Sequence, residues 1–378
     1  MGRRLPYFLL IALAVFFPLF GAGEAKAADA VKIGLMAPTT GAWASEGQDM
    51  VKVLNILVDQ INAKGGINGA LIALSVGDDG GTPKTAALAS QRLVTTGVVA
   101  VVGTYGSAVT EASQDIYDEA GVVQVATGST SIRLSEKGLK RFFRTCPRDD
   151  EQGRVLANQV KALGFVKPAI LHDNTSYAKG LADETREIFK ELSVKEVYFD
   201  AINPGDRDFA VPLSKIRAQN PDVVVFTGYY PEAAMILRQK RDLGWDVPII
   251  GGDATNNRSL VEIAGPEAAA GYYFVSPPGP GDMKSPAALE FFKIYREKHG
   301  GLPSSVWAVL AGDAFSVIAE AIKNVGPDSG KIAEFLHSGL KGFTGLSGAI
   351  AFDEKGDRIG EVYRLYKVDD KGEFVLQN

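Results

Sequence analysis

The stretch that decides the fold is VVAVVGTYGSAVT, residues 98–110. Its first five residues are apolar and indicate a buried strand, and residues 107–117 have the pattern of a helix. A glycine-containing turn between a buried strand and a helix is a common anion site in α/β proteins, because the helix N-terminus offers unpaired N–H groups. The turn carries Ser107, whose hydroxyl either binds such an anion or only caps the helix. The sequence leaves both interpretations open.

Strand-like and helix-like segments alternate on both sides of this turn. The first four predicted strands are residues 31–36, 71–76, 98–102 and 122–126. The first predicted helix covers residues 50–61. The alternation restarts after Cys146 and continues to about residue 275. Strands that alternate with helices form parallel sheets, so the sequence predicts an α/β fold with two doubly wound units. Ligands of such sheets bind at the carboxyl ends of the strands.

Composition excludes several classes of function. The chain has 378 residues, a net charge of −5 and no basic cluster, which argues against nucleic acid as a partner. Its three histidines are scattered and Cys146 is its only cysteine, so we expect no metal, no cofactor and no internal disulfide. No nucleophile or acid–base motif is present, and we expect no enzyme. The pair Asp78–Asp79 is interpreted as a solvated turn.

The N-terminus has the three parts of a secretory signal peptide. Arg3 and Arg4 precede an apolar run over residues 5–20, and Ala25-Lys26-Ala27 fits the small-x-small rule for cleavage. The run is too short and too interrupted by proline to favour a membrane anchor. We therefore expect residues 1–27 to be removed and the mature protein, with a net charge of −7, to lie in the periplasm.

Several longer stretches carry a resemblance to a known family. They are DQINAKGGING (residues 59–69), DIY (115–117), YAKGLA (177–182), GYYPE (228–232) and DEKGD (353–357). In these stretches, and over nearly all of the mature chain, the sequence resembles type I periplasmic binding proteins of the leucine/isoleucine/valine-binding class.

The resemblance implies two lobes joined by a hinge of three crossovers, near Thr145, Ser276 and Phe352. It assigns residues 28–145 and 277–351 to the N-terminal lobe, and residues 146–276 and 352–378 to the C-terminal lobe. It also implies that the lobes close on a free amino acid or related carboxylate and that the closed form docks on an ABC permease in the inner membrane. We expect a monomer.

The resemblance also implies a binding site, residue by residue. The carboxylate-binding serine falls on Ser107, and a strand-end backbone and hydroxyl pair falls on Gly128 and Thr130, with Ser129 between them. Two second-lobe tyrosines fall on Tyr177 and Tyr229. The acid that binds the ligand ammonium falls on Asp253, which is shorter than the usual glutamate. Together these residues imply a site for the head group of an amino acid, with a branched-chain, aliphatic or aromatic side chain.

The chain departs from this pattern at the ligand side chain and at a disulfide. Glu46 stands where the branched-chain binder has a tyrosine that faces the ligand, and Trp43 lies three residues earlier. Either Glu46 points into the cleft beside Trp43, or it turns to solvent at the cleft rim. The family's small disulfide would need cysteines at Gly81 and Gly106. Two alternative functions stay open: a ligand-sensing subunit for a membrane receptor, and a binder of a small carboxylate or amide that is not an amino acid.

Overall fold

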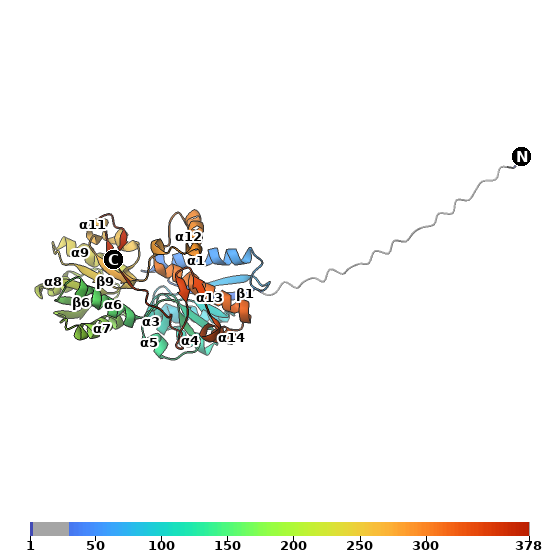
Figure 1. The fold of residues 1–378 in the computed structure, drawn as a ribbon, viewed down its shortest axis with the longest axis horizontal. Coiled ribbons are helices and arrows are strands. Elements are labelled where there is room, and N and C mark those ends of the chain that lie inside the picture. The colour runs from blue at the N-terminus through green and yellow to red at the C-terminus, as the bar shows by residue number, and fades with distance from the viewer. Residues whose placement is uncertain (3–29, 378) are drawn as a thin grey trace.

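The computed structural model describes residues 1–2 and 30–377 and has two lobes side by side (Figure 1). The predicted signal peptide lies outside the described residues, apart from Met1 and Gly2, and stays a prediction. No helix in residues 30–377 is long and apolar enough to cross a membrane.

The first lobe is built on a five-stranded sheet in the order β2–β1–β3–β4–β5, with every pairing parallel. Its strands are β1 (Val31–Ala37), β2 (Ile72–Asp78), β3 (Ala100–Val102), β4 (Val123–Ala126) and β5 (Phe142–Arg144). The helices between them are α1 (Ala44–Asn62), α2 (Pro83–Thr95), α3 (Ser107–Glu111), α4 (Gln114–Glu119) and α5 (Arg133–Glu136). Buried aliphatic residues on the strands form the core, as parallel sheets require.

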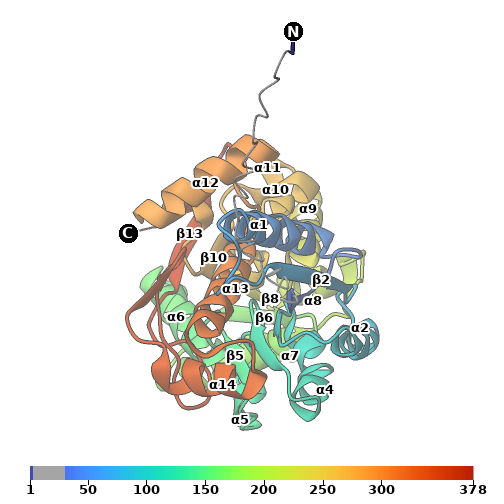
Figure 2. The ribbon, with the colours of Figure 1, turned by 90° about the vertical axis from the view of Figure 1, so that its right-hand side faces the viewer.

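Late segments of the chain complete this lobe. They are α12 (Pro286–His299), α13 (Val306–Val325), α14 (Ser329–Glu334) and the hairpin of β11 (Phe343–Gly345) and β12 (Gly348–Ile350). Figure 2 shows α13 beside α1, and the two helices pack closely. Because α13 is apolar on nearly all sides, it is buried along most of its length.

The second lobe is built on a seven-stranded sheet in the order β14–β13–β10–β9–β8–β6–β7. Its strands are β6 (Pro168–His172), β7 (Tyr198–Ala201), β8 (Val223–Thr227), β9 (Ile249–Gly251), β10 (Tyr273–Ser276), β13 (Arg364–Val368) and β14 (Phe374–Leu376). Strands β6 to β10 pair in parallel, and β13 and β14 add an antiparallel edge. The helices are α6 (Asp149–Ala162), α7 (Ser176–Glu191), α8 (Ala210–Ala218), α9 (Tyr230–Asp242), α10 (Ser259–Ala264) and α11 (Pro266–Ala269).

The chain passes between the lobes three times: after β5, after β10 and after β12. The exact lobe boundaries at residues 145, 276 and 351 stay a prediction.

Two helices differ from their predictions. The helix predicted over residues 107–117 is divided into α3 and α4, since the hydroxyl of Ser113 donates to the carbonyl of Thr110 and interrupts the helix there. Helix α1 begins at Ala44, six residues before its predicted start at residue 50. The buried residues of its first turns include the acids Glu46 and Asp49. Apolar periodicity does not detect a helix face of that kind.

The interpretation of Asp78–Asp79 as a solvated turn is wrong for Asp79, whereas Asp78 stays partly exposed. Asp79 is buried, and this burial raises the pKa of its carboxyl to about 7. Asp78 accepts hydrogen bonds from the backbone of Thr39 and from the hydroxyl of Thr40. The Asp78 carboxyl therefore fixes the loop after β1 against the end of β2, which positions the start of α1. The Asp79 carboxyl accepts from the backbone N–H of Gly81 at 2.8 Å, within its own turn.

Candidate ligand-binding site

A cluster of four aromatic side chains lies where the two lobes meet. Trp43 and Tyr105 belong to the first lobe, and Tyr177 and Tyr229 to the second. Trp43 stacks on Tyr229 with ring centroids 4.1 Å apart, and Tyr105 contacts both rings edge-on. Tyr177 lies 5.4 Å from Tyr229, centroid to centroid. The predicted residues Trp43, Tyr177 and Tyr229 therefore come together across the cleft.

Two glycines make this cluster possible. A Cβ atom on Gly106 would lie 2.8 Å from the Trp43 ring, and one on Gly128 would lie 2.6 Å from the Tyr105 ring. Because such distances are shorter than van der Waals contact, any larger residue would displace the rings. Gly81 and Gly106, where the family has a disulfide, both lie against Trp43, so the indole occupies this part of the cleft instead.

Hydroxyl groups at two strand-end turns of the first lobe form one side of the region where the lobes meet. We call Ser107, Ser129 and Thr130 the hydroxyl wall; all three are buried. Ser107 does not cap its own helix, since Gly106 is the N-cap residue, and its Oγ instead accepts from the backbone N–H of Ser131 at 3.2 Å. The Thr130 hydroxyl lies beside the carboxyl of Asp149 and has no other hydrogen-bond partner. Ser107 and Thr130 can therefore still donate protons to a ligand.

Ser129 has a different position within this wall. Its hydroxyl lies 3.1 Å and 3.2 Å from the carbonyl oxygens of Thr104 and Tyr105, and 2.7 Å from the hydroxyl of Thr110. These contacts join the turn after β4 to the turn after β3. Ser129 therefore holds the two loops together, and its hydroxyl is already engaged.

Carboxyl groups of the second lobe form the other side, and one of them, Asp149, lies next to Thr130 of the hydroxyl wall. Asp253 follows β9 and is buried, and the hydroxyls of Tyr177 and Tyr363 donate to its two oxygens at 2.9 Å and 2.8 Å. Its backbone N–H donates to Gln152 at 2.9 Å. Burial raises the pKa of Asp253 to about 7, although the phenol donors oppose the shift.

Asp149 is a second acid at this side, and sequence reasoning missed it. It is the first residue of α6 and is buried, and burial together with the nearby Asp253 raises its pKa well above the ordinary value. Apart from the Thr130 hydroxyl beside the carboxyl, its Oδ2 atom has no hydrogen-bond partner. We call Asp149 and Asp253 the acid wall. Within the described residues, neither carboxyl forms an ion pair with lysine or arginine.

Other functional residues were also missed. Tyr105 lies in the glycine turn, but its aromatic ring gave no periodic signal there. Asp149 is one of three consecutive acids at the start of a helix, a pattern that usually reflects only the helix dipole. Tyr363 belongs to a C-terminal segment more than 200 residues from Gln152, and no local pattern links the two.

Glu46 does not turn to solvent, so that alternative is wrong. Its side chain is fully buried in the first turn of α1, accepts from Asn257 Nδ2 at 2.6 Å and bonds to the hydroxyl of Ser305. Asn257 belongs to the second lobe and Ser305 to the first, so Glu46 is a contact between the lobes. Burial raises its pKa to about 8. Whether Glu46 contacts the ligand stays a prediction.

A hollow of about 640 Å³ lies at the rim of the cleft. Its lining includes Trp43, Glu111, Arg133, Ser176 and Tyr229. Arg133 donates to Glu111 and to Ser176 of the other lobe, both at 2.8 Å. The described residues contain no group of histidine, cysteine, aspartate and glutamate side chains that could hold a metal ion.

A family model described as periplasmic binding protein matches residues 30–373. The chain belongs to this family. One similar curated protein is Leu/Ile/Val-binding protein homolog 1 of Brucella abortus. It is 33% identical over 374 residues, which are 97% of this chain and 98% of that one. An amino acid binding protein of Pseudomonas aeruginosa is 34% identical over 378 residues and 99% of both chains.

Solved structures of periplasmic binding proteins confirm the fold. The leucine binding protein LivK of Thermotoga maritima superposes with a TM-score of 0.86 at 32% identity, over 92% of this chain and 98% of that one. The protein LivJ of Streptococcus pneumoniae, in complex with isoleucine, gives 0.83 at 31% identity, over 92% and 100%. The predicted family and the two-lobed α/β fold are therefore confirmed. The family is one of solute-binding proteins, not of enzymes.

Proposed function

We propose that this periplasmic binding protein captures a free amino acid with an aliphatic or aromatic side chain between its lobes and delivers it to an ABC permease. The relatives support the class of ligand, since one solved neighbour holds isoleucine and another is a leucine binding protein. The predicted signal peptide supports a place of action in the periplasm.

The observation that carries the proposal is the contrast between the two sides of the cleft. The acid wall holds two buried carboxyl groups without a cation, and one oxygen of Asp149 has no partner apart from the Thr130 hydroxyl beside it. Buried carboxylates need a positive partner, because an unpaired charge away from water is unfavourable. An ammonium group at the acid wall supplies that charge, and the hydroxyls of Ser107 and Thr130 are available to a carboxylate. An amino acid presents both groups.

The aromatic cluster supports an apolar side chain on the ligand. Trp43, Tyr105 and Tyr229 offer ring surface beside the hydroxyl wall, and such surface favours aliphatic and aromatic groups. Glu46 does not oppose this choice, since both of its oxygens already have protein partners.

The test is a ligand screen on the mature protein. We expect L-leucine, L-isoleucine, L-valine or L-phenylalanine to raise the melting temperature; a ligand at 100 times its Kd adds about 2.7 kcal/mol of stability. The matched control is 4-methylpentanoate, which has the shape of leucine without the ammonium group. Equal stabilisation by leucine and 4-methylpentanoate would contradict a zwitterion site. Loss of amino-acid uptake on gene deletion distinguishes import from sensing.

A further inference from the structure

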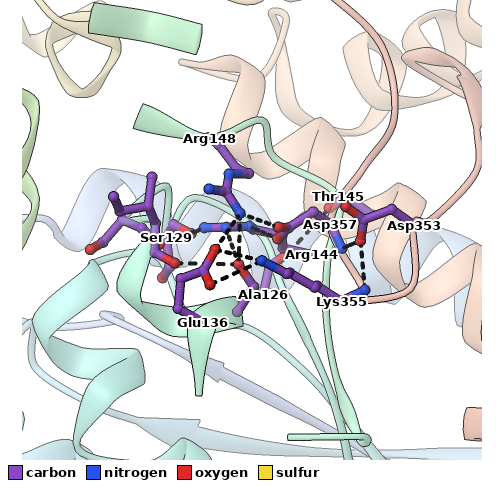
Figure 3. Close-up of polar contacts among 12 residues, drawn as sticks. Ala126, Ser129, Glu136, Arg144, Thr145, Arg148, Asp353, Lys355 and Asp357 are labelled. Carbon is purple, nitrogen blue, oxygen red and sulfur yellow. Dashed lines mark hydrogen bonds and ion pairs between the residues drawn. The ribbon is translucent and has the colours of Figure 1, made fainter. Parts of the chain in front are cut away.

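Arg144 is a fully buried arginine outside the ligand-contacting residues described above. It is the last residue of β5, directly before the first crossing between the lobes. Its guanidinium group makes four hydrogen bonds: to the carbonyls of Ser129 and Ser131 at 3.0 Å and 2.8 Å, to Ser135 Oγ at 2.9 Å, and to Asp357 Oδ1 at 2.6 Å. Figure 3 shows Arg144 between Ser129 and Asp357. A planar fork of donors is needed to reach acceptors in these different directions.

Two of these acceptors belong to the hydroxyl wall and its flank. The carbonyls of Ser129 and Ser131 lie on either side of Thr130, so Arg144 holds the backbone of the residue whose hydroxyl has no protein partner other than the Asp149 carboxyl beside it. The N–H of Ser131 donates to Ser107 Oγ. One guanidinium group therefore fixes the segment that carries Thr130 and orients Ser107.

Asp357 connects the same arginine to the hinge. It is buried, lies in the third crossing and also accepts from Arg148 Nη1 at 2.7 Å. Arg148 directly precedes Asp149 of the acid wall. Although burial opposes it, the two arginines hold the pKa of Asp357 below its ordinary value. Asp357 thus joins residues on both sides of the first crossing to the third crossing.

We propose that Arg144 is a positioning residue, oriented by Asp357, that sets the geometry of the ligand-carboxylate site from the hinge. It does not touch the ligand; it acts through the backbone on either side of Thr130. The inference rests on the proposed function, because it requires a ligand with a carboxylate at the hydroxyl wall.

The test compares L-leucine with L-leucinamide, which lacks the carboxylate. R144K keeps the charge but cannot reach all four acceptors, and S135A removes one acceptor without changing any charge. We expect R144K to weaken L-leucine binding at least tenfold and L-leucinamide binding much less, so that discrimination between the two falls at least fivefold. S135A should shift the same ratio in the same direction by a smaller factor.

The control is K355Q, two residues from Asp357, which removes the exposed ion pair between Lys355 and Glu136 seen beside Arg144 (Figure 3). It should leave the leucine-to-leucinamide ratio unchanged. The inference is overturned if R144K, or S135A where R144K does not fold, weakens both ligands by the same factor, since a purely structural role predicts that result. It is also overturned if the parent protein binds leucinamide as well as leucine. A parent protein that binds none of the four amino acids overturns the proposed function, and this inference with it.

Discussion

The two sides of the cleft differ in charge, because one carries hydroxyl groups and the other carries buried carboxyl groups. The hydroxyl wall is neutral: Ser129 is engaged within the protein, and only Ser107 and Thr130 have capacity left for a ligand. The acid wall holds two carboxyl groups that burial drives toward the protonated form. A neutral donor that loses its ligand loses one hydrogen bond, whereas a buried carboxylate that loses its cation is left as an unpaired charge.

This difference indicates which side should contribute more to the affinity for the ligand. Truncating one partner of a buried, hydrogen-bonded charge pair costs about 2–5 kcal/mol of binding, and losing a neutral donor to a charged group costs about 1.5–3 kcal/mol. The acid wall should therefore select ligands that carry an ammonium group, and the hydroxyl wall should contribute less. Asp253→Asn and Ser107→Ala test this order, and Trp43→Leu and Glu46→Gln compare the two walls with contacts between the lobes.

Asp253→Asn should have the largest effect. The amide keeps the shape of the side chain but removes the charge, so the Kd for L-leucine should rise about 30-fold or more. Binding of 4-methylpentanoate, which has no ammonium group, should change little. Calorimetric titration of both ligands measures the two effects.

The control for Asp253 is Asp313→Asn, which changes a buried acid of α13 that binds the backbone of Leu346 and Ser347. It should leave the ratio of the two Kd values unchanged. If Asp253→Asn weakened both ligands equally, Asp253 would not belong to the ammonium site, and the comparison of the two walls would be wrong.

Ser107→Ala should have the next largest effect. Loss of one hydrogen bond to a carboxylate weakens binding by about 1.5–3 kcal/mol, or about 10- to 100-fold. Ser90→Ala is the matched control, because Ser90 is also buried but its hydroxyl bonds only to Ala87 of its own helix. Unchanged leucine affinity in Ser107→Ala would mean that Ser107 contacts Ser131 and does not bind the ligand.

Trp43→Leu should have a smaller effect, because Trp43 belongs to neither wall. The substitution removes the stacking between Trp43 and Tyr229 across the cleft, which is worth about 0.5–1.5 kcal/mol beyond buried area. The Kd for L-leucine should rise about three- to tenfold. Trp245→Leu, in the second lobe, controls for the loss of an indole. A Trp43 variant that binds leucine as tightly as the parent would show that the stacking does not contribute to closure.

The sequence predicted the fold better than it predicted the contacts between the lobes. The glycine turn at residues 103–106 and its neighbouring strand ends were found because parallel strands align their carboxyl ends, and this rule needs only local pattern. Asp149, Tyr363 and Arg144 were missed, since their roles depend on residues far away in the chain. Pairs such as Gln152–Tyr363 form only after the third crossing brings the last segment back.

Glu46 is another residue whose contact with the other lobe the sequence did not predict. Its two sequence interpretations both treated it as a cleft residue that faces either ligand or water, and neither considered a protein partner. The partner is Asn257, 211 residues away on the other lobe. We expect Asn257 to leave Glu46 when the lobes separate, so the environment of Glu46 should depend on closure more than that of any residue in the hydroxyl wall.

The last prediction uses this dependence and concerns Glu46→Gln. Burial raises the pKa of Glu46 to about 8 in the present structure, from an ordinary value of 4.5. A raised pKa in the closed form means that closure favours the protonated acid. The contribution of protonated Glu46 to the stability of the closed form is fully present below pH 4.5 and is lost as the pH rises through about 8. The affinity for the ligand falls by up to tenfold for each pH unit in this range.

Glutamine is neutral at every pH, so the ratio of the parent's Kd for L-leucine to that of Glu46→Gln should rise between pH 5.5 and pH 8. The substitution should have the smallest effect of the four at pH 4.5 and below, where the parent's Glu46 is largely protonated in both the open and the closed form. The ratio separates Glu46 from Asp253, whose titration is present in both proteins and has the opposite sign, because a charged Asp253 is needed for the ammonium group. Glu297→Gln, an exposed position on α12, is the control. Parallel pH profiles for the parent and Glu46→Gln would mean that Glu46 stays in the same environment in the open and closed forms, and its contact with Asn257 would then not depend on closure.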